Sequence, residues 1–321
     1  MKRRYHLIGL VAGLVVTVVF IAYVARSLRG HDLAAYVTPR AFAGIGLAAL
    51  FYCLSLPLIA WAWRDLLRGL AVFKSWRELT AILAITQFAK YLPGNIGQYV
   101  GRTAMSLSRG IGLRAFGVTV VIEMVSLMGA ALVVGIGAGL LSNVGFALAR
   151  GKDEQIALIC AVLVAAIIGL VLFRTLAPRI LQRFTPQHAH LLEGSLLPPR
   201  LTLIRAFLFY CATYCMVGIG IIALAHLLLP SQAHDNWLLV ASFALAWVVG
   251  FVTPGAPAGL GVREGLLLLM LGPIYTPALA GILIIALRLA TTLGDAINFV
   301  VGLILLPKKT QPPAAVPSSL A

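Results

Sequence analysis

The chain has 321 residues, of which 61% are hydrophobic and 11% are charged, and its mean hydropathy is +0.99. This balance excludes a soluble globular protein and indicates that lipid surrounds most of the chain. A formal net charge of +15 would point to nucleic acid in a soluble protein. In a membrane protein it is typical of Lys- and Arg-rich cytoplasmic loops, so we expect no nucleic-acid partner.

Apolar stretches follow one another along the chain, and the segments between them are mostly short. They cover residues 7–25, 41–63, 79–100, 115–141, 156–173, 206–229, 237–252 and 265–306. The first follows a basic start and resembles a signal peptide, but it is about 19 residues long and has no small-x-small cleavage site. We therefore expect an uncleaved first helix. The pattern predicts one integral membrane domain over residues 1–306 and a short disordered cytoplasmic tail over 307–321.

Two Pro-Gly breaks interrupt the apolar pattern, and each is followed by an arginine nine residues after the proline. They are Pro93-Gly94 with Arg102, and Pro254-Gly255 with Arg263. The arms beside them are 79–92, 95–110, 237–252 and 258–272, each about 15 residues long. That length is too short to cross a core of ~30 Å at ~1.5 Å per residue. Because proline removes a backbone donor and glycine permits a reversal, each break is typical of a hairpin tip.

The distribution of Lys and Arg supports this threading. If every apolar stretch crosses the membrane, the flanking charges divide equally between the two sides. If the two hairpins return to their own side, 17 lie inside and only five lie outside, namely Arg26, Arg29, Arg40, Arg150 and Lys152. We therefore predict an all-α polytopic membrane protein with six full transmembrane helices plus two re-entrant helical hairpins. The hairpins enter from opposite sides, as in an inverted repeat, and both termini are cytoplasmic.

Several charged residues lie inside apolar segments, where each costs about 2.5–3.5 kcal/mol near a helix centre. They are Lys90, Arg102, Glu123, Arg263, Glu264, Arg288 and Asp295. Glu123 has no charged neighbour along its own helix, so it pairs with another helix, stays protonated or faces water. Arg102 is the partner we expect. Either the pair only fixes the packing, or Glu123 carries a proton.

A polar stripe follows helical spacing on the last apolar segment. Its members are Arg288, Thr291, Thr292, Asp295 and Asn298. Residues seven apart share a helix face, so Arg288 and Asp295 point the same way. The stripe is either a polar lock between helices or part of a substrate path.

The two hairpin tips predict an anion site. A half-helix is expected to begin near Asn95 and another near Leu260, just after Gly259, and free amides at helix N-termini attract anions. Arg102 and Arg263 would add donors suited to phosphate, and Glu264 would tune or gate the site. The structural alternative is a pair of loops that only plug the bundle. The predicted substrate-binding residues are Pro93, Gly94, Asn95, Arg102, Glu123, Pro254, Gly255, Gly259, Arg263, Glu264, Arg288 and Asp295.

Motifs for enzyme chemistry are absent from the sequence. It has no Ser-His-Asp set, P-loop, C-x-x-C or H-x-x-E-H pattern, and no acidic cluster for a metal-dependent transferase. The four cysteines, Cys53, Cys160, Cys211 and Cys215, lie in apolar spans and are expected to be buried thiols. We expect no catalytic activity, no metal and no cofactor.

The two interrupted segments carry a family resemblance. YLPGNIGQ at residues 91–98 with Arg102, and PGAPAGLGVREG at residues 254–265, are similar to the two hallmark motifs of the lysylphosphatidylglycerol synthase transmembrane-region family. The resemblance covers nearly the whole chain, and Glu123 and Arg288 fall where that family tends to keep charged membrane residues. It implies a flippase-like module that moves or presents lipid between leaflets. The soluble aminoacyltransferase domain of the lipid synthases is not part of this sequence, which implies a stand-alone member.

The sequence therefore predicts a protein of the bacterial inner membrane that translocates or presents an anionic lipid between leaflets. The lipid would be of phospholipid or polyprenyl-phosphate type. The alternative is a non-transporting partner or scaffold of a membrane-bound lipid-modifying enzyme or lipid-linked glycosyltransferase.

Overall fold

The computed structural model describes residues 33–91, 97–148, 197–253 and 261–307, with isolated positions at 22, 25, 26, 154, 156–158, 161 and 259. Every regular element in these ranges is a helix. In chain order they are η1 (Leu33–Tyr36), α2 (Pro39–Arg68), α3 (Trp76–Gln87), η2 (Phe88–Tyr91), α4 (Gly97–Ser108), α5 (Leu113–Leu141), α6 (Asn143–Leu148), α8 (Arg200–Leu228), α9 (Asn236–Val252), α10 (Val262–Leu271) and α11 (Pro277–Leu305).

Within the described ranges, four helices are long and apolar enough to cross a membrane: α2, α5, α8 and α11. They have 29 or 30 residues and mean hydropathies of 1.7 to 2.2 over their most apolar windows. At ~1.5 Å per residue each exceeds the ~30 Å hydrocarbon core. These four agree with the predicted multi-pass membrane protein. The predicted spans at 7–25 and 156–173 fall almost entirely outside the described residues.

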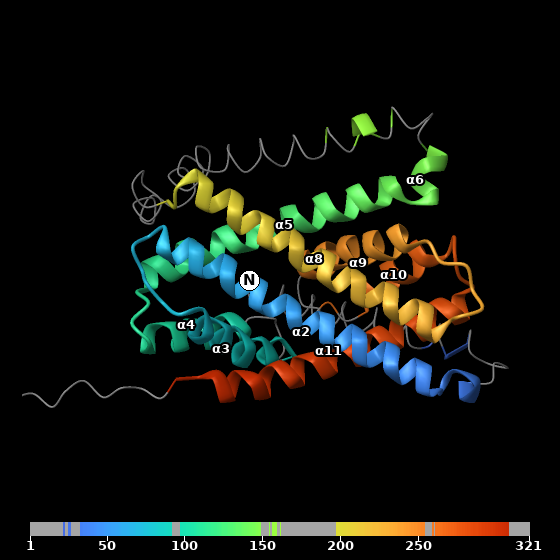
Figure 1. Cartoon of the computed structure of the whole chain (residues 1–321), viewed down its shortest axis with the longest axis horizontal. Coiled ribbons are helices and arrows are strands. Elements are labelled where there is room, and N and C mark those ends of the chain that lie inside the picture. The colour runs from blue at the N-terminus through green and yellow to red at the C-terminus, as the bar shows by residue number, and fades with distance from the viewer. Residues whose placement is uncertain are drawn as a thin grey trace, which may run out of the picture.

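Four shorter helices form two pairs. Helices α3 and α4 have 12 residues each and contact one another, and α9 with 17 residues contacts α10 with 10. In Figure 1 the first pair lies towards the end of the bundle where α11 finishes, and the second pair lies towards the opposite end. The predicted hairpin tips, residues 92–96 and 254–258, lie outside the described residues.

Local sequence explains where several helices begin. Thr38 and Thr276 each precede a proline at the first helical position, and each threonine hydroxyl accepts a backbone N–H three residues on. Ser75 caps α3 and Asp235 caps α9 in the same way. Such caps satisfy amides that have no partner within the helix, and proline suits the first turn because its missing N–H is not needed there.

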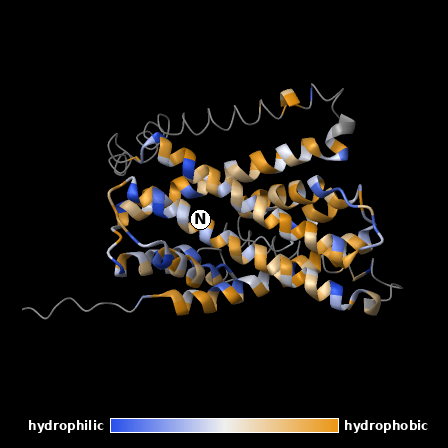
Figure 2. Cartoon of the chain, in the orientation of Figure 1, coloured by the Kyte–Doolittle hydropathy of each residue, from blue (hydrophilic) through white to orange (hydrophobic). Residues whose placement is uncertain are grey.

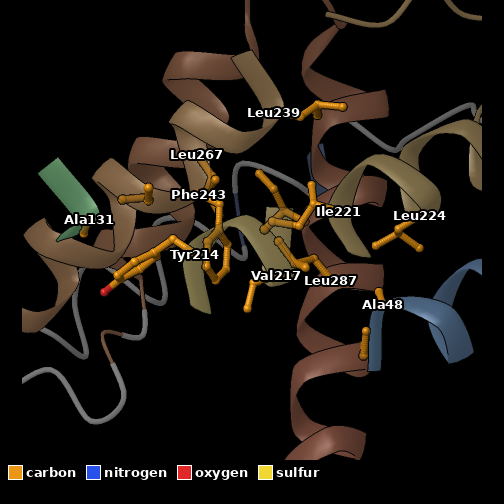
Figure 3. Packing of buried hydrophobic residues seen from close by; sticks show 14 of the residues in the cluster. Ala48, Ala131, Tyr214, Val217, Ile221, Leu224, Leu239, Phe243, Leu267 and Leu287 are labelled. Carbon is orange, nitrogen blue, oxygen red and sulfur yellow. The ribbon is translucent and has the colours of Figure 1, made fainter. Parts of the chain in front are cut away.

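Close packing at small residues joins the long helices. Of the described helices, α2 and α8 share the most extensive contact, and an added Cβ on Gly220 would lie 3.2 Å from the Cα of Ala48 there. Membrane helices pack well through such residues because lipid offers no hydrophobic drive for their association. Figure 3 shows the resulting core, in which Ile221 and Leu224 of α8, Leu239 of α9 and Leu287 of α11 lie together.

Apolar side chains also cover the outside of the helices. Figure 2 shows hydrophobic residues along the long helices and polar residues mainly near their ends. Ile304 of α11 is 77% exposed and Leu269 of α10 is 76% exposed. Exposed apolar surface of this extent is expected where the surrounding solvent is lipid.

Candidate functional site

One cavity of about 200 Å³ lies inside the bundle. The N-terminal half of the chain contributes α2, α3, η2, α4 and α5 to its walls, and the C-terminal half contributes α8, α9, α10 and α11. Six of the seven charged residues predicted within apolar segments line it: Lys90, Arg102, Glu123, Arg263, Arg288 and Asp295. The structure thus collects charges from both interrupted segments around a single space.

Arg102 of α4 and Glu123 of α5 form a buried ion pair. Their side chains are only 5% and 8% exposed, and Nη1 and Nη2 of Arg102 donate to Oε1 and Oε2 of Glu123 at 2.6 and 2.7 Å. The guanidinium also lies 3.9 Å from the ring centre of Trp63, whose indole N–H donates to Thr119. The predicted pairing of Glu123 with Arg102 is confirmed. Two parallel hydrogen bonds and an aromatic face hold the arginine in one orientation.

Lys90 of η2 and Asp295 of α11 form a second pair. The Lys90 ammonium lies 2.8 Å from each oxygen of the carboxylate, and the hydroxyl of Tyr52 donates to Asp295 at 2.9 Å. Lys90 and the side-chain amide of Gln87 both donate to the same hydroxyl, at 2.9 and 3.1 Å. An added Cβ on Gly294 would lie 2.6 Å from the Tyr52 ring, so the absence of a side chain there lets the tyrosine lie against α11.

Arg288 of α11 and Glu264 of α10 form the third pair, through Arg288 Nε and Glu264 Oε1. The other carboxylate oxygen of Glu264 accepts the backbone N–H of Gly261 at 2.7 Å. Glu264 therefore caps the start of α10 and contacts α11, rather than pairing with its neighbour Arg263. The side chain of Glu264 thus satisfies one of the amides at this half-helix, the N–H of Gly261, which was expected from the sequence to be free.

Arg263 differs from the other three cations. Its guanidinium lies 4.4 Å from the ring centre of Phe243, and no carboxylate of the described residues comes within 4.0 Å of it. Four cations, Lys90, Arg102, Arg263 and Arg288, are thus matched by three carboxylates. The described site carries one positive charge in excess, and that charge is on Arg263.

The remaining predicted residues are distributed as follows. Gly259 lines the cavity with φ of +69°, and its backbone lies against Gly250 of α9, where an added Cβ would come within 3.2 Å. Pro93, Gly94, Asn95, Pro254 and Gly255 lie outside the described residues. Thr291 lines the cavity beside Arg288 and Asp295, whereas Thr292 is exposed. Across the described ranges, His, Cys, Asp and Glu nowhere gather in threes that would hold a metal ion.

A family model described as the lysylphosphatidylglycerol synthase TM region matches residues 10–297. The chain belongs to this family. A comparison with curated proteins gives no match. Every charged residue of the cavity, from Lys90 to Asp295, lies within the matched range.

Sequence reasoning missed the uncharged part of this family member's site. Tyr52 and Gln87 connect to the Lys90–Asp295 pair, and Trp247 and Tyr214 line the cavity with their rings 5.6 Å apart, edge to face. Aromatic residues are frequent in apolar helices, so their sequence pattern does not separate a cavity wall from a lipid-facing surface. A polar signal was present only for Gln87, which lies three residues before Lys90.

Proposed function

We propose that this protein binds the anionic head group of a membrane lipid in the central cavity and moves or presents that lipid between leaflets. The observation that carries the proposal is the charge balance of the cavity, in which three cations have carboxylate partners and Arg263 has none among the described residues. A phosphate group would supply the missing negative charge. The family membership is in keeping with a lipid as the source of that phosphate.

The surroundings of Arg263 favour a ligand over a permanently uncompensated charge. A cation inside a membrane protein costs several kcal/mol unless water, a counterion or a polar group stabilises it. The Phe243 ring provides part of that stabilisation, on the order of 1–2 kcal/mol when water is excluded. Arginine is suited to the remainder because its planar guanidinium can donate two parallel hydrogen bonds to a phosphate.

The two pairs of short helices complete the proposed architecture. In it, α3 with α4 and α9 with α10 re-enter from opposite faces of the membrane, and segments 7–25 and 156–173 add two crossings to the four long helices. At ~1.5 Å per residue, 12-residue helices reach only ~18 Å, so their inner ends would lie near the midplane. Secondary transporters commonly bind substrates at broken helices in this position. The membrane would be the bacterial inner membrane, with both termini cytoplasmic.

Helix α11 provides a physical link between the two pairs. Asp295 contacts Lys90 next to the first pair, and Arg288, two turns earlier, contacts Glu264 of the second pair. A change in either ion pair would therefore alter the contact between α11 and the adjacent pair of short helices. A scaffold protein, the alternative function, needs no such charged interior.

Leaflet exchange in vesicles tests the proposal. Purified protein would be reconstituted into phosphatidylcholine vesicles that contain fluorescent phosphatidylglycerol, and the fraction of probe accessible to a membrane-impermeant quencher would be followed. We expect faster exchange than in protein-free vesicles, and mass spectrometry of the purified protein should identify a co-purified anionic lipid. Exchange no faster than in empty vesicles, together with purification free of anionic lipid, would contradict the proposal.

A further inference from the structure

Arg102 and Arg263 occupy corresponding environments in the two halves of the chain. Each follows a proline by nine residues, each lines the same cavity, and each guanidinium lies over an aromatic ring, at 3.9 Å for Trp63 and 4.4 Å for Phe243. They differ in their charged contacts, since Arg102 binds Glu123 and Arg263 binds no carboxylate of the described residues. The two positions are therefore chemically alike, and one of them holds an internal anion.

The contact between Arg102 and Glu123 resembles the way arginine binds a phosphate. Two nearly equal hydrogen bonds, at 2.6 and 2.7 Å, join the two terminal nitrogens to the two carboxylate oxygens. Arginine uses the same two-pronged geometry for phosphate oxygens. The Nε atom of Arg102 is buried and has no hydrogen-bond partner in the described ranges. The carboxylate thus leaves the Nε–H donor of Arg102 without an acceptor, and a phosphate, which has additional oxygens, would be able to accept from it.

Glu123 is also held by fewer of the described residues than the other two carboxylates. Glu264 accepts the Gly261 backbone N–H as well as Arg288, and Asp295 accepts the Tyr52 hydroxyl as well as Lys90. Within the described part of the chain, Glu123 accepts hydrogen bonds from Arg102 alone. To displace Glu123, an incoming anion would therefore have to replace the two hydrogen bonds that it accepts from this one residue.

We propose that Arg102 is a second anion site and that Glu123 is its built-in occupant, displaced when a lipid phosphate moves along the cavity. The inference rests on the proposed function and adds an order of events to it. A phosphate binds first at Arg263, and it reaches Arg102 only by replacing Glu123. The anion site at Arg102 is thus closed by Glu123 while the site at Arg263 receives the head group.

The test counts bound anions. Purified protein in a non-ionic detergent would be titrated with dihexanoylphosphatidylglycerol and analysed by native mass spectrometry at low temperature, with a parallel calorimetric titration using inorganic phosphate. The variants are Glu123→Gln, the double variant Arg102→Met/Glu123→Gln, and Asp65→Asn as a matched control. Asp65 pairs with Arg205 at 3.3 Å and does not line the cavity, so its substitution also removes a carboxylate from an arginine.

We expect one tightly bound anion in the wild type and in Asp65→Asn, two in Glu123→Gln, and one again in the double variant. A single bound anion in folded Glu123→Gln would overturn the inference while leaving the proposed function intact. A wild type that binds no anion would instead contradict the proposed function. Equal counts with lipid and inorganic phosphate would assign recognition to the phosphate group, and binding of lipid alone would assign it to the whole head group.

A measurement on the unmodified protein covers the case in which Glu123→Gln does not stay folded. The wild type should take up a second, weaker anion at higher concentration, because that anion must displace Glu123. The double variant removes both charges together and should lack this second event. An identical second event in both proteins would place it elsewhere and overturn the inference.

Discussion

Lys90 and Asp295 contact one another at 2.8 Å although 205 residues separate them in the sequence. The pair joins η2, next to the first interrupted segment, to the polar face of the last helix. Its carboxylate is 2% exposed and its ammonium side chain 17% exposed. A contact of this kind stabilises one arrangement of the two elements and makes the removal of a single partner costly.

Replacement of Asp295 by asparagine should destabilise the fold, because it removes the carboxylate counterion of Lys90. We expect the free energy of unfolding to decrease by about 3 kcal/mol. Lys90→Met combined with Asp295→Asn should recover at least half of that loss, as the two residues are directly coupled. Unfolding in detergent, followed by circular dichroism, would be measured for the wild type, the two single variants and the double variant. Additive losses in the double variant would show that the pair contributes no coupling energy.

Substitution of Arg263 should separate a bidentate phosphate contact from a simple positive charge. We expect Arg263→Ala to reduce leaflet exchange at least tenfold, the equivalent of ~1.4 kcal/mol, while the protein remains folded. Arg263→Lys should restore only part of the rate, because an ammonium has neither the planar fork nor the same stacking on Phe243. Full activity of Arg263→Lys would exclude the bidentate contact.

Glu123→Gln should lower stability as well as alter transport. The structure favours this outcome over a fully stable variant in which Gln mimics a protonated Glu123. The reason is that Glu123 lies in a bidentate pair with Arg102, whose side chains are 8% and 5% exposed, respectively. Removing one charge of such a pair costs about 3–5 kcal/mol. Melting temperature and lipid exchange would be measured on the same preparation. A variant as stable as the wild type and inactive in exchange would point instead to a protonation role.

Membrane topology can be tested with single cysteines placed in a background that lacks the four native ones. Leu113 at the start of α5 is 62% exposed, and Ser231 in the segment between α8 and α9 is also exposed. We expect a membrane-impermeant maleimide to label Leu113→Cys only from the cytoplasmic side and Ser231→Cys only from the outside. Labelling of Leu113→Cys from outside would remove the basis for a re-entrant first hairpin.

The segment before α9 predicts a small pH dependence of stability. The Nδ1 atom of His234 lies 2.6 Å from the hydroxyl of Tyr275, and its ring centre lies 4.2 Å from that of His226, with Asp235 adjacent in sequence. Burial, and then the charge of His226, lower the pKa of His234. Burial raises the pKa of Tyr275 to about 12, so its hydroxyl keeps its proton at neutral pH.

Because the folded protein holds the pKa of His234 below its ordinary value of about 6.5, this histidine takes up its proton first in the unfolded chain as pH falls. The stability that neutral His234 contributes is therefore complete above pH ~6.5, and it is lost as pH falls through the pKa of His234 in the folded protein. We expect the melting temperature to decrease by on the order of 1 °C between pH 7.5 and pH 5.5. His234→Gln should abolish that difference. An unchanged pH profile in the variant would assign the effect to other groups.

Composition and local pattern were sufficient for the coarse architecture. The long apolar stretches predicted α2, α5, α8 and α11, and the Pro-Gly breaks separated α3 from α4 and α9 from α10. These features depend on residues close in the chain: apolar length matches the thickness of the bilayer, and proline and glycine interrupt a helix wherever they occur. The charged residues of the cavity were also recognisable, because a charge inside an apolar run is costly and rarely accidental.

Only the tertiary structure decided how those charges pair. Glu264 is adjacent to Arg263 in sequence yet binds Arg288, because it caps α10 and its side chain turns towards α11. Asp295 shares a helix face with Arg288 yet binds Lys90, and Tyr52 completes that contact because Gly294 leaves room for its ring. Periodicity places side chains on a face, but ion pairing depends on distances of a few ångströms between elements far apart in the chain. The excess positive charge therefore became assignable to Arg263 only when the helices were packed together.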